Sequence, residues 1–192
     1  MLTNRIMGAF TLRKSVYAEV EQDTSFTSTA WILVVVVAFL SQLGSSASSS
    51  ELLGWLIGAI VGTILAIIGF VVGVLVINWA GRIIFKADVR FNELVRTLGL
   101  AYVWQVVGVL GIPIAFFDVF SGELYVIQVL AVVMLIISWL VAAKEALDLG
   151  WLQTGFTVLL GWIAQFVITT GITALVLGLL GLVADALGGG QF

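Results

Sequence analysis

The chain has 192 residues, of which 61% are hydrophobic and only 10% are charged, and its mean hydropathy is +1.21. Soluble domains carry about 25% charged residues, so a water-soluble monomer is excluded. Eight Lys and Arg against eleven Asp and Glu give a net charge of -3. This balance argues against nucleic acid as a partner, because neutralising phosphates requires a basic surface.

Residues 1–23 are predicted to form a cytoplasmic amphipathic segment. Apolar residues from Ile6 to Val20 recur at helical spacing beside Arg5, Arg13 and Lys14. A helix with this pattern lies in the membrane interface, with its apolar face toward the acyl chains.

Residues 24–192 are predicted to form an all-α, polytopic transmembrane bundle of five spans. A helix needs about 20 apolar residues to cross about 30 Å of hydrocarbon. Five segments free of internal charge meet this need, at 27–43, 52–80, 98–117, 124–143 and 155–184. A cleaved signal peptide is the competing interpretation of the first span, because Ala47 and its neighbouring serines resemble a cleavage site. The charged segment before the span is too long for that, so we expect the span to be retained.

The positions of the basic residues predict the orientation in the membrane. Three precede the first span, Arg82, Lys86, Arg90 and Arg96 lie between the second and third, and Lys144 follows the fourth. The other connections hold none. Since short basic loops stay in the cytoplasm, we expect the N-terminus inside and the C-terminus outside.

Small residues at intervals of about four are predicted to mediate close helix packing. Without a hydrophobic drive between helices in lipid, such residues let backbones approach. The predicted packing residues are Gly54, Gly58, Gly62, Gly69 and Gly73 in the second span and Gly171 and Gly178 in the fifth. Packing within the bundle and a dimer or partner interface are both open interpretations.

Polar side chains inside the spans are few and uncharged. A transporter or proton relay is expected to place ionisable groups near the bilayer midplane, so transport is disfavoured. The single proline, Pro113, predicts a kink or helix end near the outer end of the third span, with a gating hinge as the alternative. The polar residues are Gln42, Asn78, Gln105, Gln128, Gln165, Thr169 and Thr170.

The predicted cytoplasmic face carries the charges, and two hypotheses apply to them. The charges either anchor the chain to lipid phosphates or form a docking surface for a protein partner. The candidate contact residues are Arg5, Arg13, Lys14, Arg82, Lys86, Arg90 and Arg96.

The sequence predicts neither catalysis nor a cofactor or metal site. With no Cys and no His, thiolate and imidazole metal ligands and Cys or His nucleophiles are excluded. No phosphate-binding loop and no pair of carboxylates in a pocket-forming segment is present in the sequence.

Two segments resemble the prokaryotic branch of the Yip1 domain family. They are Phe91–Ala101, FNELVRTLGLA, at the entry to the third span, and Ile137–Leu147, ISWLVAAKEAL, at the end of the fourth. The Asp-Leu-Tyr-Gly-Pro motif of eukaryotic members is absent, and Tyr102–Gln105 lacks the proline that often follows Gly-x-Ala. The resemblance implies a non-enzymatic integral protein of a prokaryotic plasma membrane that works through protein or lipid contacts.

The leading hypothesis is therefore a Yip1-like protein for membrane organisation or scaffolding. Its partners would be the lipid bilayer and other integral membrane proteins or further copies of itself. An accessory or assembly subunit of a respiratory or photosynthetic complex is the alternative. A small permease is a weaker one.

The orientation can be tested with reporters that are active only outside the cytoplasm. Because the basic residues are segregated, fusions after Ser46, Ser121 or Phe192 should be active, and fusions after Lys86 or Leu149 inactive. An active fusion after Lys86 would contradict the assignment of spans.

Overall fold

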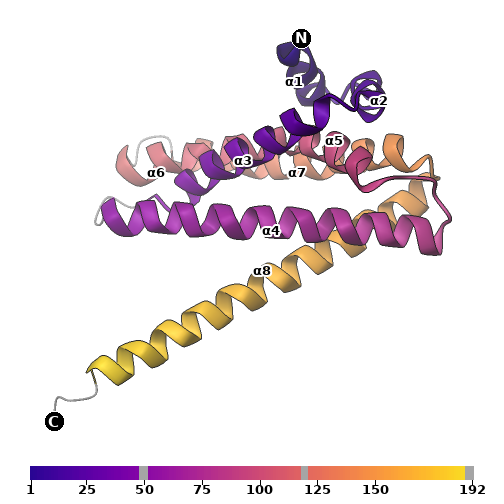
Figure 1. Ribbon diagram of the computed structural model, residues 1–192. Helices are drawn as coiled ribbons and strands as arrows, with labels where there is room; N and C mark the ends of the chain where they lie inside the picture. The colour runs from indigo at the N-terminus through magenta and orange to yellow at the C-terminus, as the bar shows by residue number, and fades with distance from the viewer. Residues whose placement is uncertain (48–51, 118–120, 189–192) are drawn as a thin grey trace.

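The computed structural model describes residues 1–47, 52–117 and 121–188, and its regular structure over these ranges is helical (Figure 1). The elements in chain order are α1 (Leu2–Phe10), α2 (Lys14–Gln22), α3 (Phe26–Ser45), α4 (Leu52–Ile84), α5 (Phe91–Ala101), the 3-10 helix η1 (Tyr102–Leu110), α6 (Gly111–Phe117), α7 (Ser121–Leu147) and α8 (Trp151–Gly188).

Five helical segments are long and apolar enough to cross a membrane, which marks the chain as an integral membrane protein. They are Phe26–Ser45, Leu52–Ile84, Phe91–Phe117, Gly122–Leu147 and Trp151–Val176. The predicted all-α class is confirmed, and each predicted span overlaps one of these segments. The third begins at Phe91 rather than Leu98, because α5 buries Leu94 and Val95 in the protein core.

The third candidate span changes helical type along its course. α5 passes directly into η1 and then into α6. A nine-residue 3-10 segment is unusual, because the side chains eclipse and the hydrogen bonds are poorer than in an α-helix. Pro113 lies in the first turn of α6, where its missing N–H is tolerated. The predicted irregularity at the outer end of this span therefore begins well before the proline.

α8 packs against the bundle along its first half only. In Figure 1 it crosses the end of α4 and then diverges from the other helices. At the crossing, a Cβ placed on Gly161 would lie 2.9 Å from the carbonyl oxygen of Gly73 and 2.6 Å from Cγ1 of Ile77. This close backbone approach fixes α8 to α4 near its start.

The N-terminal segment differs from the single interfacial helix expected between Asn4 and Glu21. It forms α1 and α2, and the chain reverses around Leu12, whose φ is +52°. Tyr17 and Val20 of α2 are fully buried and belong to the same hydrophobic core as the spans. Residues 1–23 are therefore packed onto the bundle, because α2 has apolar side chains that the neighbouring helices α5 and α7 cover.

The tightest contact between candidate spans joins α3 to η1 and α6. A Cβ on Gly44 would lie 2.7 Å from the carbonyl carbon of Gly108, and one on Gly111 would lie 2.6 Å from the carbonyl carbon of Gly44. A Cβ on Gly108 would in turn meet the side chain of Ser41. Only glycine allows these backbones to approach so closely.

We expect Gly111→Ala or Gly44→Ala to destabilise the protein by about 1–3 kcal/mol, because the added methyl group forces two backbones apart. The greater helix propensity of alanine, worth about 1 kcal/mol, opposes this loss. Thermal unfolding in a mild detergent measures the effect. Gly155→Ala is the control, since no described atom of another element lies within 4 Å of its Cβ position. Equal midpoints for Gly111→Ala and the control would contradict the close contact.

Candidate functional site

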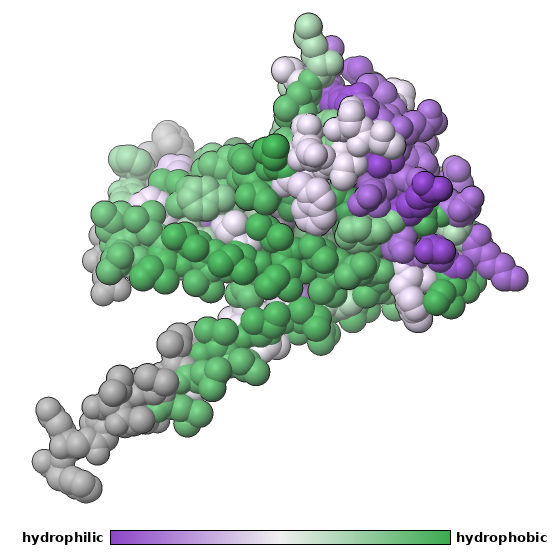
Figure 2. Space-filling model, viewed as in Figure 1, coloured by the Kyte–Doolittle hydropathy of each residue, from purple (hydrophilic) through white to green (hydrophobic). Residues whose placement is uncertain are grey.

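Charged side chains gather at one end of the molecule, where α1 and α2 lie (Figure 2). We call this the charged end; it comprises α1, α2 and the connections at 85–90 and 148–150. It is the end predicted to be cytoplasmic. Five of the predicted contact residues are exposed at this end or, for Arg82, in the last turn of α4 next to it, and they remain candidates for lipid or protein contacts: Arg13, Lys14, Arg82, Lys86 and Arg90.

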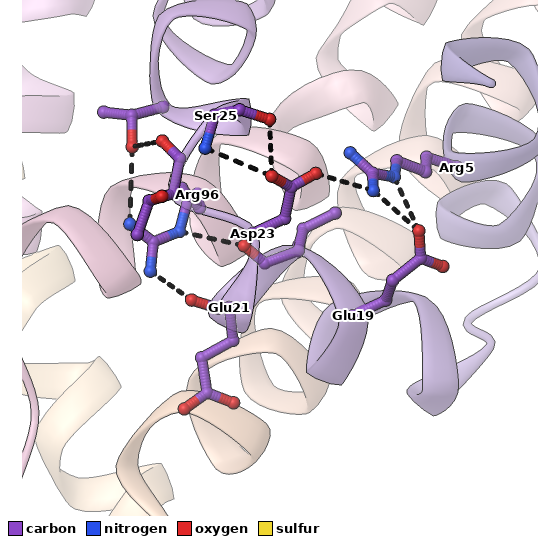
Figure 3. A network of polar contacts seen from close by, with 9 residues as sticks. Arg5, Glu19, Glu21, Asp23, Ser25 and Arg96 are labelled. Carbon is purple, nitrogen blue, oxygen red and sulfur yellow. Dashed lines mark hydrogen bonds and ion pairs between the residues drawn. The ribbon is translucent and has the colours of Figure 1, made fainter.

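Arg96 is not available for such contacts. Its side chain is only 4% exposed and lies against the last turn of α2 (Figure 3). Its Nε donates a hydrogen bond of 2.9 Å to the carbonyl of Val20, and its Nη2 donates to the carbonyl of Glu21. Nη1 donates to Oγ1 of Thr27 at 3.3 Å. A cation at the C-terminus of a helix is favourable, since the last carbonyls otherwise lack donors. Arg96 therefore ties the third span to α2 and α3.

Arg5 pairs with two carboxylates at the junction of α2 and α3. Its Nη2 lies 2.6 Å from Glu19 and 2.8 Å from Asp23. Asp23 also accepts hydrogen bonds from the backbone N–H and hydroxyl of Ser25 at 3.1 and 2.5 Å (Figure 3). The Ser25 hydrogen bonds, and after them Arg5, hold the pKa of Asp23 below its ordinary value. This network orders the entry to α3.

Glu21 lies among other acidic groups at the charged end. Burial raises the pKa of its carboxyl, and the negative charges of Asp148, Glu93 and Glu145 raise it further. Arg96 opposes this shift. The Arg96 guanidinium binds the Glu21 backbone, so the carboxylate itself gains no ion pair from it.

Tyr17 connects α2 to the fourth span. Its hydroxyl shares a hydrogen bond of 2.7 Å with the hydroxyl of Ser138 on α7, and both residues are fully buried. Burial raises the pKa of Tyr17 to about 12, although the hydrogen bond to Ser138 lowers it. The phenol is therefore neutral at physiological pH and acts as a structural donor or acceptor.

The predicted packing glycines fall into three groups. A Cβ placed on Gly69 or Gly73 would meet Gln165 of α8, one on Gly62 would meet Gln42 of α3, and one on Gly58 would lie 3.4 Å from Ser46. Gly54 is exposed. No described atom of another element lies within 4 Å of the Cβ positions of Gly171 and Gly178, so no packing at these two glycines is found among the described residues.

A polar cavity of about 520 Å³ lies between α3, η1, α6 and α7, in the half of the bundle away from the charged end. We call it the outer cavity. Hydroxyl and amide groups line one part of it and aliphatic side chains the other. The polar lining residues are Ser41, Gln42, Ser45, Gln105, Tyr125 and Gln128, and the apolar ones include Ile114, Ala131, Val132 and Leu135.

The irregular third span shapes one wall of the outer cavity. Trp104 and Gln105 belong to η1, and Gly108 and Gly111, which meet α3, border the same space. The indole Nε1 of Trp104 is buried and has no hydrogen-bond partner among the described residues. The Trp104 ring packs edge-on against Phe10 of α1, with the ring centroids 5.0 Å apart.

Aromatic side chains fill the bundle between the outer cavity and the charged end. Phe70 packs edge-on against Trp31, Tyr102 and Trp139, with ring centroids 5.3–6.0 Å apart. Phe70, Tyr102 and Trp139 are at most 2% exposed. None of these residues is among those that line the outer cavity.

In the sequence, Gln42, Gln105 and Gln128 stand out only as polar residues within predicted spans, with no role assigned. The feature of the sequence that could have pointed to them is the presence of one uncharged amide in each of three spans. Gln42 and Gln128 also lie toward the same predicted side of the membrane. Which of them share a cavity depends on the rotation of each helix about its axis, which hydropathy alone does not specify.

Comparisons of this chain with protein-family models, with curated proteins and with solved structures find no match. The resemblance of Phe91–Ala101 and Ile137–Leu147 to the Yip1 domain family therefore stays a prediction from those two segments.

We expect Arg96→Met to destabilise the protein by about 3 kcal/mol. The change keeps the apolar stem but removes the donors, and it leaves two carbonyls of α2 without these bonds. The measurement is thermal unfolding in detergent, together with the rate of proteolysis within residues 1–23. Arg82→Met, at an exposed site, should change neither. Unaltered proteolysis in Arg96→Met would show that Arg96 does not hold α2 in place.

Proposed function

We propose that this chain is a non-enzymatic, membrane-organising protein that holds the headgroup of a neutral lipid in the outer cavity. The supporting observation is the cavity itself, whose lining combines uncharged polar groups with apolar side chains and lies within the helical bundle. Amide and hydroxyl groups at this depth are costly without partners, so their convergence from α3, η1 and α7 favours a binding role.

The chemistry of the lining favours a neutral ligand. The residues that line the outer cavity include amides and hydroxyls, which donate and accept hydrogen bonds, and none of them is Lys, Arg, Asp or Glu. An anionic phosphate would lose its hydration without gaining a counter-charge. A headgroup rich in hydroxyl groups, such as a sugar, suits this lining.

The mixed lining favours an amphiphile over a small solute. Ile114, Val132 and Leu135 offer an apolar surface beside the amides, which matches the boundary between a headgroup and its chains. The cavity volume is in the range of about 300–1,000 Å³ that is typical of ligand sites.

The aromatic cluster around Phe70 favours binding over transport. A permease needs access from both sides of the membrane, whereas side chains that are almost fully buried fill the bundle beyond the cavity. A permease is therefore not part of this proposal.

Contacts at the charged end extend the proposal to the other leaflet. Arg13, Lys14, Arg82, Lys86 and Arg90 are exposed, and each basic side chain near an anionic membrane surface contributes about 1 kcal/mol to binding. In the orientation predicted above, they would contact cytoplasmic headgroups while the outer cavity holds a lipid from the opposite leaflet. This arrangement agrees with the role that the Yip1 resemblance implies, in a prokaryotic plasma membrane.

The test compares a neutral glycolipid with an anionic lipid. We expect the wild type in detergent to bind monoglucosyl diacylglycerol more tightly than phosphatidylglycerol, as measured by native mass spectrometry. The double variant Gln42→Met, Gln128→Met keeps the side-chain length and removes two amides. Its affinity for the glycolipid should fall at least about tenfold, since each hydrogen bond contributes about 1 kcal/mol.

The control is Gln22→Met, at the exposed end of α2 and far along the chain from the cavity residues. It should bind the glycolipid as the wild type does. Equal affinity of the wild type for both lipids, or no loss in the double variant, would contradict the proposed function.

A further inference from the structure

Gln105 of η1 differs from the other amides of the outer cavity in its surroundings. It borders that cavity and also a second one of about 370 Å³, which lies between η1, α7 and α8 and has mainly apolar and aromatic walls. We call the second one the lateral cavity. Val132 and Leu135 of α7 border both cavities together with Gln105. This amide is therefore placed beside aliphatic side chains.

The neighbours of Gln105 on α7 indicate its depth. Leu135 lies near the middle of the candidate span Gly122–Leu147, and Gln128 lies seven residues closer to the start of that span, at its predicted outer end. At about 1.5 Å per residue, Gln105 is therefore about 10 Å deeper in the bundle than Gln128.

The aromatic contacts support the same level for η1 and α7. Tyr102 and Trp139 both pack edge-on against Phe70, with ring centroids 5.3 and 5.9 Å from it. One turn closer to the outer end, η1 reaches Gln105 and α7 reaches Leu135.

The Gln105 amide has no partner among the described residues. Its side chain is half-buried and lines the cavity, and no hydrogen bond joins its amide to the described part of the chain. Gln42, in contrast, accepts a hydrogen bond of 3.0 Å from the Ser45 hydroxyl. An amide among apolar side chains is costly without a hydrogen bond, and a molecule in the cavity can supply one.

The surroundings of Gln105 indicate which group of a lipid would meet it. No Lys, Arg, Asp or Glu lies among the described residues that line either cavity, so a charged group would gain no counter-charge. Val132 is 56% exposed on the surface of α7, which gives acyl chains an exit into the hydrocarbon. In a glycerolipid, the polar groups that lie between the headgroup and the acyl chains are the uncharged ester carbonyls.

We infer that Gln105 binds an ester carbonyl of the lipid in the outer cavity and makes the site selective for ester-linked over ether-linked glycolipids. The inference rests on the proposed function. The Gln105 amide N–H donates to the carbonyl oxygen, whereas an ether oxygen is a weaker acceptor. Because Gln105 lies near the middle of its span, the glycerol of the bound lipid lies deeper than that of the surrounding leaflet.

The first experiment compares two glycolipids that differ only in their linkage. Native mass spectrometry measures the affinity for monoglucosyl diacylglycerol and for its dialkyl ether analogue of the same chain length. The wild type should bind the ester about fivefold more tightly, as expected for one hydrogen bond, and Gln105→Met should bind the two equally. Equal affinities in the wild type, or an unchanged preference in Gln105→Met, overturn the inference.

Gln128→Met is the matched control, because it makes the same chemical change at the level of the headgroup. It should lower both affinities by the same factor and keep the preference for the ester. Loss of the preference in this variant as well overturns the role of Gln105. Thermal unfolding verifies that both variants are folded. If the wild type binds neither glycolipid, the proposed function fails and the inference with it; if it binds both equally, only the inference fails.

The last experiment needs no variant. A monoglucosyl diacylglycerol with a diazirine beside its ester carbonyls should label the wild type within 104–108 or 131–135, which are the segments around Gln105 and Leu135. An excess of the unmodified glycolipid should prevent this labelling. Labelling confined to other segments would show that the carbonyls do not reach Gln105 and overturns the inference.

Discussion

Helices in hydrocarbon gain little from apolar contact with each other, so their association depends on how closely their backbones can approach. In this chain that constraint is met where Gly44 of α3 meets Gly108 and Gly111 of the third span. The backbone carbonyls of Gly108 and Gly44 occupy the space that a Cβ on the facing glycine would need, and this contact coincides with the change from α5 to η1 and α6. Gly44, Gly108 and Gly111 also border the outer cavity, so this close helix contact and the cavity share the same residues.

The second constraint is that a buried polar group needs a partner. At the charged end this need is met within the chain, because Arg96 binds carbonyls of α2 and Tyr17 binds Ser138. These bonds join residues far apart in the sequence and hold the N-terminal helices on the bundle. Because these helices are held in place, the exposed basic residues at the charged end have fixed positions on the surface.

Toward the middle of the bundle the same need is not met within the described residues. The indoles of Trp104 and Trp139 are both buried without an acceptor, and each belongs to the lining of a cavity. The two cavities differ in their surroundings: the outer one is rich in amides and hydroxyls, and the lateral one is mainly apolar and aromatic.

The sequence by itself determined the helical class, the five apolar segments and the position of the charges along the chain, because hydropathy and composition are local properties. It also located the irregularity of the third span near Pro113, although the 3-10 helix begins earlier because it depends on contact with α3. The packing of α2 onto the bundle was not predicted, since the burial of Tyr17 requires α5 and α7 to be in place.

Only the tertiary structure decided which residues act together. Gly44, Gly108, Gly111 and Gly161 lie where two backbones approach closely, whereas Gly171 and Gly178, two of the glycines predicted to pack, meet no other described element. Arg96 resembles the other loop arginines in sequence but is buried, and Gln42 and Gln128 share a cavity across 86 positions of the chain. The physical reason is that the rotation of each helix about its axis, and the neighbour it meets, depend on the packing of all the helices and not on any one segment.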